Sequence, residues 1–175
     1  NVMRNELTLE MFNWWAGKLQ NDIEAVARKL KGDFPLYAKN ILKIISKEGV
    51  VKPFILNAGQ RAVHHQLETQ LKEQGRIRAL CLKARQVGIS TYVEGRFFWR
   101  ITQNRNANAF VLSHLAESTN SIFNMVRHFY DNIPHPAFQP PISSQSAQTL
   151  VFDKLNSRYR VGTARSTQTG RGQTN

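Results

Sequence analysis

Short apolar runs and helical patterns alternate along the second half of the chain, and this order constrains the fold more than any other feature. Residues 77–82 form a nearly continuous apolar run, which is typical of a strand covered on both faces. A helical pattern follows at 90–102, a second strand candidate at 107–112 and a second helical pattern at 117–132. This order predicts an α/β fold in which a parallel sheet with right-handed crossovers is flanked by helices.

Cap and turn signals extend this prediction on both sides. Asn57 is a suitable N-cap for a helix over 58–74. Four prolines between positions 134 and 141 predict a long loop. The apolar segments 149–152 and 159–162 that follow the loop flank a short polar turn, which predicts a β-hairpin.

The N-terminal part of the chain has a different pattern. Apolar side chains recur at helical spacing over 8–31 and again over 37–45, and Glu48-Gly49 is typical of a helix C-terminus. We therefore expect an N-terminal helical segment over residues 1–50. The α/β domain is expected over residues 51–175.

Charge is the most informative part of the composition. The chain has 24 Lys and Arg against 12 Asp and Glu, and residues 76–175 alone carry 13 basic and 4 acidic side chains, a net of +9. This imbalance favours a polyanion as partner, either nucleic acid or a nucleoside triphosphate. No apolar run is long enough to span a membrane, and a single cysteine, Cys81, favours a reducing, cytoplasmic setting.

The loop between the first predicted strand and its helix is the most specific segment. It reads Lys83-Ala-Arg-Gln-Val-Gly-Ile-Ser-Thr91, and a loop in this position turns backbone N–H groups and a helix N-terminus toward one anion. Gly88 and Ser90 match the phosphate-loop pattern G-x-x-x-x-G-K-[ST], whereas Lys83 replaces the first glycine and Ile89 the lysine. Lys83 and Arg85 are positioned to replace the missing lysine.

Several ordered segments together resemble the large terminase subunit of tailed bacteriophages, the ATPase that drives DNA into the capsid. The resemblance covers about residues 50–175. The segments that carry it are Pro53-Phe54-Ile55-Leu56-Asn57 with Gln60, the loop Lys83–Thr91, Ser113-His114, Gly162-Thr163-Ala164 and Gly170-Arg171-Gly172.

The resemblance implies an incomplete, helicase-like P-loop NTPase fold that binds ATP and Mg²⁺. Gln60 would read the adenine edge, and Phe54 would pack on the adenine ring. Lys83 would contact the β- and γ-phosphates, Arg85 would be a second phosphate or transition-state contact, and Ser90 would be a ligand of Mg²⁺. The implied nucleotide-binding residues are Phe54, Gln60, Lys83, Ala84, Arg85, Gln86, Val87, Gly88, Ile89, Ser90 and Thr91.

The resemblance also implies partners and a setting. Double-stranded DNA, the portal protein and the small terminase subunit are the expected partners, with a homo-oligomer possible in the full motor, in the cytoplasm of a bacterial host. Arg171, between two glycines, is the candidate for coupling hydrolysis to motion.

The sequence departs from the family at the acidic positions. Hydrolysis requires one carboxylate for the metal shell and another to orient water. Asp153 follows an apolar run, but the next residue is Lys154. We therefore expect an ATP-binding portion that neither hydrolyses ATP nor cleaves DNA alone. Another helicase-like ATPase, or a non-enzymatic basic module for DNA binding or assembly, is the alternative.

Overall fold

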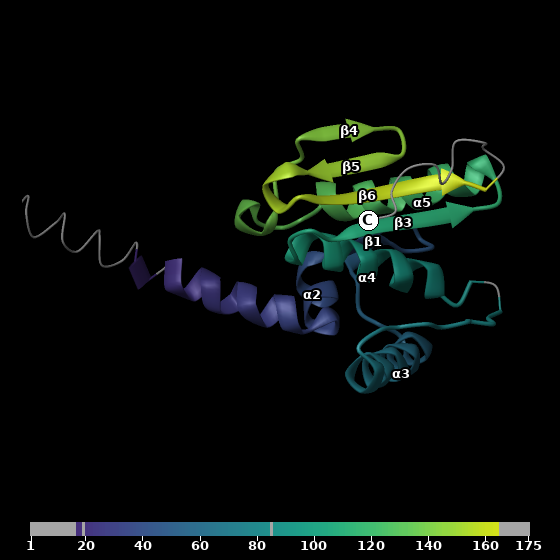
Figure 1. Cartoon of the computed structure of the whole chain (residues 1–175), viewed down its shortest axis with the longest axis horizontal. Coiled ribbons are helices and arrows are strands. Elements are labelled where there is room, and N and C mark those ends of the chain that lie inside the picture. The colour runs from purple at the N-terminus through teal and green to yellow at the C-terminus, as the bar shows by residue number, and fades with distance from the viewer. Residues whose placement is uncertain (1–16, 19, 85, 165–175) are drawn as a thin grey trace, which may run out of the picture.

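A computed structural model describes residues 17–18, 20–84 and 86–164, which form a mixed α/β structure (Figure 1). Residues 20–32 are helical, as expected for that part of the first predicted helix. The further helices are α2 (Phe34–Ile41), α3 (Ala58–Gln74), α4 (Ile89–Gln103) and α5 (Ala116–Asp131), with the 3₁₀ turns η1 (Pro136–Phe138) and η2 (Asp153–Leu155). The strands are β1 (Lys43–Ile45), β2 (Val51–Pro53), β3 (Asn108–Ser113), β4 (Ser144–Ser146), β5 (Thr149–Phe152) and β6 (Ser157–Thr163).

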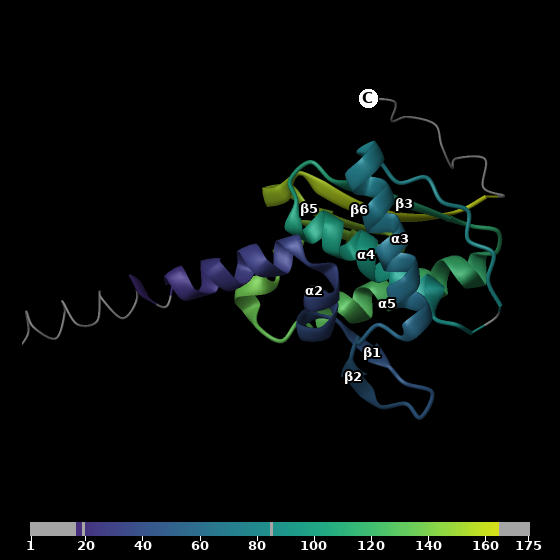
Figure 2. The same cartoon turned by 90° about the horizontal axis from the view of Figure 1, so that it is seen from below.

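The main sheet has four strands in the order β3-β6-β5-β4. β3 and β6 are parallel, whereas β6, β5 and β4 pair antiparallel. Helices α4 and α5 pack on the same face of β3 and β6, and both helices lie to one side of these strands when the molecule is seen from below (Figure 2). The predicted α/β class with helices packed on the sheet is confirmed, but the sheet is mixed and not parallel, because β3 and β6 are the only neighbouring strands among the described ones that pair in parallel.

Helix α3 has the predicted bounds because its ends carry strong local signals. The Asn57 side chain accepts from the Gln60 N–H, and the Gln60 side chain accepts from the Asn57 N–H, which completes a capping box. Gly75 ends the helix in the left-handed conformation, with φ of 68°. The predictions of α4, α5, β3 and the β5–β6 hairpin are confirmed to within a few residues.

The helix predicted over 37–45 is wrong in its second half. α2 ends at Ile41, and Lys43–Ile45 pairs with β2 as an antiparallel hairpin. Gly49, expected to end a helix, has φ of 77° and lies in the hairpin turn, where its N–H donates to the Ser46 carbonyl. Ile45 is 59% exposed, so the apolar spacing that suggested a helix face does not correspond to burial here.

The strand predicted over 77–82 is also wrong. Residues 77–84 have no strand or helix assignment, and Leu80 and Leu82 are fully exposed. An apolar segment becomes a buried strand only where neighbouring strands supply hydrogen bonds and cover. No described strand pairs with this segment; β3, the edge strand of the main sheet, pairs with β6 alone among the described strands. The parallel pair of the sheet is therefore β3 with β6.

One core includes residues from the N-terminal segment and from the α/β part. Phe34 contacts the rings of Tyr92 and Trp99, with centroids 5.5 and 5.6 Å away. The Trp99 indole N–H donates to the Leu30 carbonyl over 2.9 Å. Residues 30–42 of the predicted N-terminal segment thus pack directly on α4.

Candidate functional site

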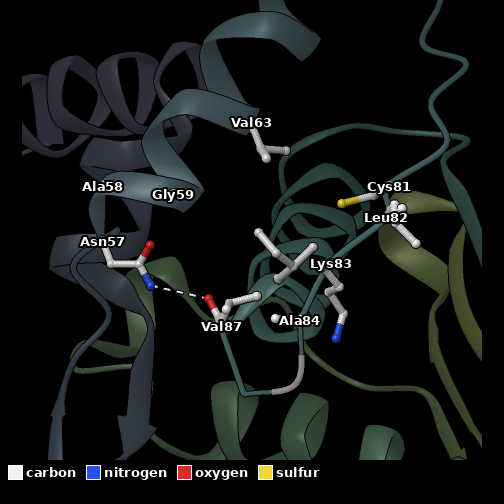
Figure 3. A pocket seen from close by; sticks show the side chains of 10 residues that line it. Asn57, Ala58, Gly59, Val63, Cys81, Leu82, Lys83, Ala84 and Val87 are labelled. Carbon is white, nitrogen blue, oxygen red and sulfur yellow. Dashed lines mark hydrogen bonds between the residues drawn. The ribbon is translucent and has the colours of Figure 1, made fainter.

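A hollow of about 590 Å³ lies beside the predicted phosphate loop. Asn57, Ala58 and Gly59 form one side of it, and the segment that includes Leu82 and Lys83 forms the other (Figure 3). Of the predicted binding residues, Lys83, Ala84, Val87 and Ile89 line this hollow. A volume of this size is within the range of about 300–1,000 Å³ that small-molecule sites occupy.

The turn into α4 has two residues with positive φ near the start of the helix. Gln86 and Gly88 both have positive φ, 61° and 75°, and Gly88 is the N-cap of α4. Among the described residues, no side chain caps the N-terminus of α4. The first N–H groups of α4, at Ile89, Ser90 and Thr91, therefore lie at the positive end of the helix without a side-chain acceptor from the cap residue.

The N-termini of α3 and α4 are held together at this turn. The Gln60 amide nitrogen donates to the Gly88 carbonyl over 2.7 Å, and the Asn57 amide nitrogen donates to the Val87 carbonyl over 3.3 Å. Gln60 is only 3% exposed. Its side chain thus bonds both helix N-termini and lies beneath the turn. Recognition of adenine by Gln60 stays a prediction, and it would require the amide to rearrange these bonds or to share them.

Phe54 does not have the position expected of a residue that packs on adenine. Its ring is 1% exposed and stacks on Phe129, with centroids 6.5 Å apart. It also lies against Gly95 of α4, where a Cβ would come within 3.2 Å of the Phe54 ring. No face of this ring is open to a ligand, so Phe54 is a core residue and its expected contact with the base is wrong.

The cations of the predicted site are described only in part. Lys83 is exposed and lines the hollow. Ser90 is exposed in the first turn of α4. Arg85 and Arg171 lie outside the described residues, so their predicted roles have no structural description.

A polar cluster that sequence reasoning missed joins the middle of α3 to α4. Arg96 forms an ion pair with Glu68, with 2.6 Å between Nη1 and Oε1. The His64 Nδ1 atom lies 3.0 Å from the Tyr92 hydroxyl and 3.2 Å from Arg96 Nη1. Burial and the Arg96 charge lower the pKa of His64, which favours the neutral ring, whose Nδ1 atom is an acceptor for the Arg96 guanidinium. The signal in the sequence was helical spacing of His64 and Glu68, which face α4 together.

Replacing Gly88 with alanine tests the joint between the two helix N-termini. A Cβ at Gly88 would lie 2.8 Å from the Gln60 amide nitrogen, in addition to the strain of φ at 75°. We expect Gly88→Ala to lower the free energy of unfolding by about 2–3 kcal/mol, because left-handed strain costs roughly 1–2 kcal/mol and the Gln60 bond is also lost. Urea denaturation measures this change.

Gly75→Ala is the matched control. Gly75 has φ of 68°, but a Cβ there meets nothing within 4 Å. We expect it to cost only the backbone strain, about 1 kcal/mol. Equal losses in the two variants would contradict a role for the Gln60–Gly88 contact.

Comparison with known proteins adds no family assignment. No protein-family model matches the sequence, and no curated protein matches it. Among the described residues, no helix is long and apolar enough to cross a membrane. Within the same part of the chain, no group of three or more His, Cys, Asp or Glu side chains is placed to hold a metal ion.

Proposed function

We propose that this chain is the ATP-binding N-terminal portion of a phage terminase large subunit, the motor that packages double-stranded DNA into a capsid. The observation that carries the proposal is the meeting of three groups at one hollow: the uncapped N-terminus of α4, the left-handed Gly88 that precedes it, and Lys83 on the rim. The sequence resemblance supplies the family. The P-loop NTPase fold and the partners named for the family belong to the same proposal.

The phosphates are the part of ATP that these groups fit best. Free N–H groups at a helix N-terminus and a lysine ammonium are both donors for phosphate oxygens. Lys83 takes the place of the lysine that usually follows the second glycine, where this chain has Ile89, a buried residue. The apolar remainder of the hollow, including Val63 and Val87, offers contact surface for the rest of the nucleotide.

Magnesium fits this site only together with the nucleotide. Mg²⁺ keeps several waters and is usually held by few protein ligands plus substrate phosphates. Ser90, exposed in the first turn of α4, supplies one hydroxyl. The chemistry that the ion supplies when bound is neutralisation of phosphate charge.

Binding without turnover is the expected behaviour of this chain alone. Asp153, the acidic residue at the end of an apolar strand, is exposed in η2 and precedes Lys154. Asp153 therefore lacks the neighbouring carboxylate that would orient an attacking water. In this account the chain binds the nucleotide, and hydrolysis of the nucleotide belongs to the complete motor.

Calorimetric titration of Mg-ATP into the parent and two lysine variants tests the site. We expect Lys83→Ala to weaken binding about 10- to 100-fold, because a charged hydrogen bond contributes about 1.5–3 kcal/mol. Lys72→Ala is the matched control, since Lys72 is exposed in the last turn of α3, away from Asn57. Ser90→Ala should reduce the difference between titrations with and without Mg²⁺.

Equal binding by parent and Lys83→Ala would remove Lys83 from the site, and no heat with the parent would contradict nucleotide binding.

Competition between ATP and GTP adds a test of Gln60. Unequal binding that Gln60→Ala abolishes supports base recognition, whereas equal binding by the parent contradicts it. Another helicase-like ATPase would give the same binding results, so the family assignment depends on the sequence segments quoted above.

A further inference from the structure

The second face of the main sheet is open among the described elements. Helices α4 and α5 pack on one face, whereas the other face is covered by no described element (Figures 1 and 2). Parallel strand pairs are usually covered on both sides. The residues of this open face, paired across the strands, are Asn108, Phe110 and Leu112 of β3, Arg158 and Arg160 of β6, Thr149 and Val151 of β5, and Ser144 and Ser146 of β4.

The composition of the open face favours a polyanion over an apolar partner. Most of its side chains are polar or positively charged, and β3, β4, β5 and β6 contain no Asp or Glu. A face that a helix covers in a protein core is rich in Val, Ile and Leu instead. The opposite face follows that rule: Leu150, Phe152, Tyr159 and Val161 on it are fully buried.

An aromatic ring on the edge strand β3 and two arginines on the neighbouring strand β6 lie side by side on the open face. Phe110 is 44% exposed, and the Arg160 guanidinium lies over its ring, 5.6 Å from the centroid. Arg160 pairs with Phe110 across the ladder, and Arg158 pairs with Asn108 one step away. Base stacking on an aromatic ring and phosphate contact by arginine are the two interactions with which sheet faces bind single strands.

More positive charge lies at one end of the open face. The turn before β3 contains Arg105 and the turn before β6 contains Lys154, and both residues are exposed. The two turns are joined by a hydrogen bond of 2.7 Å from the Asn156 amide nitrogen to the Asn106 side-chain oxygen. Asp153 is the acidic residue in these turns, so positive charge prevails along this edge.

We propose that the open face binds single-stranded nucleic acid, with a base stacked on the Phe110 ring in place of the Arg160 guanidinium, which then pairs with a backbone phosphate as Arg158 does. A single strand can present its unstacked bases to a flat sheet face, whereas a duplex exposes only its backbone and groove edges. This surface lies on the side of the sheet away from α4, and its binding does not require nucleotide at Lys83.

Fluorescence anisotropy with a labelled 20-nucleotide oligo(dT) tests the proposal, without ATP, on the full chain. We expect Arg158→Gln with Arg160→Gln to weaken binding about 10-fold or more and to reduce the salt slope by about 1.4, since each phosphate contact to a single strand contributes about 0.7. Phe110→Leu should weaken binding by up to about 5- to 160-fold, the range of one stacked base. All three substitutions are at exposed positions, and circular dichroism checks that the fold is kept.

Arg127→Gln is the matched control, because Arg127 is exposed on α5, on the helical side of the sheet. Its loss should leave affinity nearly unchanged. An equal loss in Arg127→Gln would mean that net charge alone binds the oligonucleotide and would overturn the proposal. Tighter binding of the matching duplex, with Phe110→Leu as tight as the parent, would overturn it in favour of a duplex surface.

Discussion

Phe54→Ala is expected to lower the free energy of unfolding by about 3–5 kcal/mol, the usual cost of deleting a buried aromatic side chain. Phe54 is 1% exposed, stacks on Phe129 and lies against Gly95. Gly95 has no side chain to fill the space, and a packed core relaxes only partly around a deleted ring. Urea denaturation followed by circular dichroism measures the loss. Phe97→Ala, at a ring 38% exposed on α4, should cost about 1 kcal/mol or less.

A second variant separates the core role of Phe54 from the adenine contact that the sequence predicted. Phe54→Leu keeps an apolar side chain, so we expect the protein to remain folded with a loss of about 1–2 kcal/mol. The affinity for Mg-ATP should be unchanged in this variant. A tenfold weaker affinity together with unchanged stability would contradict the buried position and restore the adenine contact.

Glu94 is expected to make the protein less stable as pH rises from about 5 to 8. Glu94 is 3% exposed on α4 and accepts a hydrogen bond from the fully buried Tyr159 hydroxyl of β6. Burial raises the pKa of Glu94 to about 7, although the Tyr159 hydrogen bond opposes the rise. The folded state therefore holds the proton more tightly than the unfolded state, whose Glu pKa is near 4.5. Stability is full below that unfolded value and falls by about 3 kcal/mol as pH rises through the folded pKa.

Glu94→Gln should remove most of this pH dependence, because the amide oxygen still accepts from Tyr159 and carries no charge. The measured quantity is the difference in unfolding free energy between variant and parent at pH 5 and pH 8, which cancels the contributions of other groups such as His64. We expect the unfolding free energy of the variant minus that of the parent to be about 2–3 kcal/mol larger at pH 8 than at pH 5. Glu117→Gln, exposed on α5, is the control. If the difference in unfolding free energy between Glu94→Gln and the parent is the same at pH 5 and at pH 8, Glu94 is not buried as a carboxyl group.

Local signals predicted the helices and the hairpin well. Asn57, Gln60 and Gly75 define both ends of α3 through hydrogen bonds within a few residues of each other. The β5–β6 hairpin likewise depends on a short turn, where Asn156 takes a left-handed conformation. Such features need no distant part of the chain, so the sequence contains all the information that they require.

The failures are at positions where distant partners decide the structure. The apolar run 77–82 has strand composition, but pairing partners determine whether it is a strand, and Leu80 and Leu82 remain exposed. Ile44 and Ile45 continued the apolar spacing of α2, but pairing with β2 turned them into a strand. The parallel pairing of β3 with β6, 50 residues apart at Asn108 and Arg158, had no local signal.

The candidate site divides in the same way. The helix that follows the loop was predicted from the sequence pattern, and α4 begins at Ile89, whereas the left-handed conformation of Gly88 is known only from the structure. The role of Gln60 as a bridge to Gly88 and the ion pair of Arg96 with Glu68 depend on how α3 lies against α4. In both pairs the two residues are 28 positions apart in the sequence. The spacing of residues within one helix does not indicate which residues of another helix they contact.

The most direct measurement of where ATP binds is a titration of the ¹⁵N-labelled protein with Mg-ATP, followed by the backbone amide resonances. If the phosphates lie at the N-terminus of α4, the largest shifts occur at Gly88, Ile89, Ser90 and Thr91, and Lys83→Ala reduces them. If the largest shifts occur at Arg158 and Arg160 instead, ATP binds the basic sheet face as a simple polyanion, and the proposed nucleotide site is wrong.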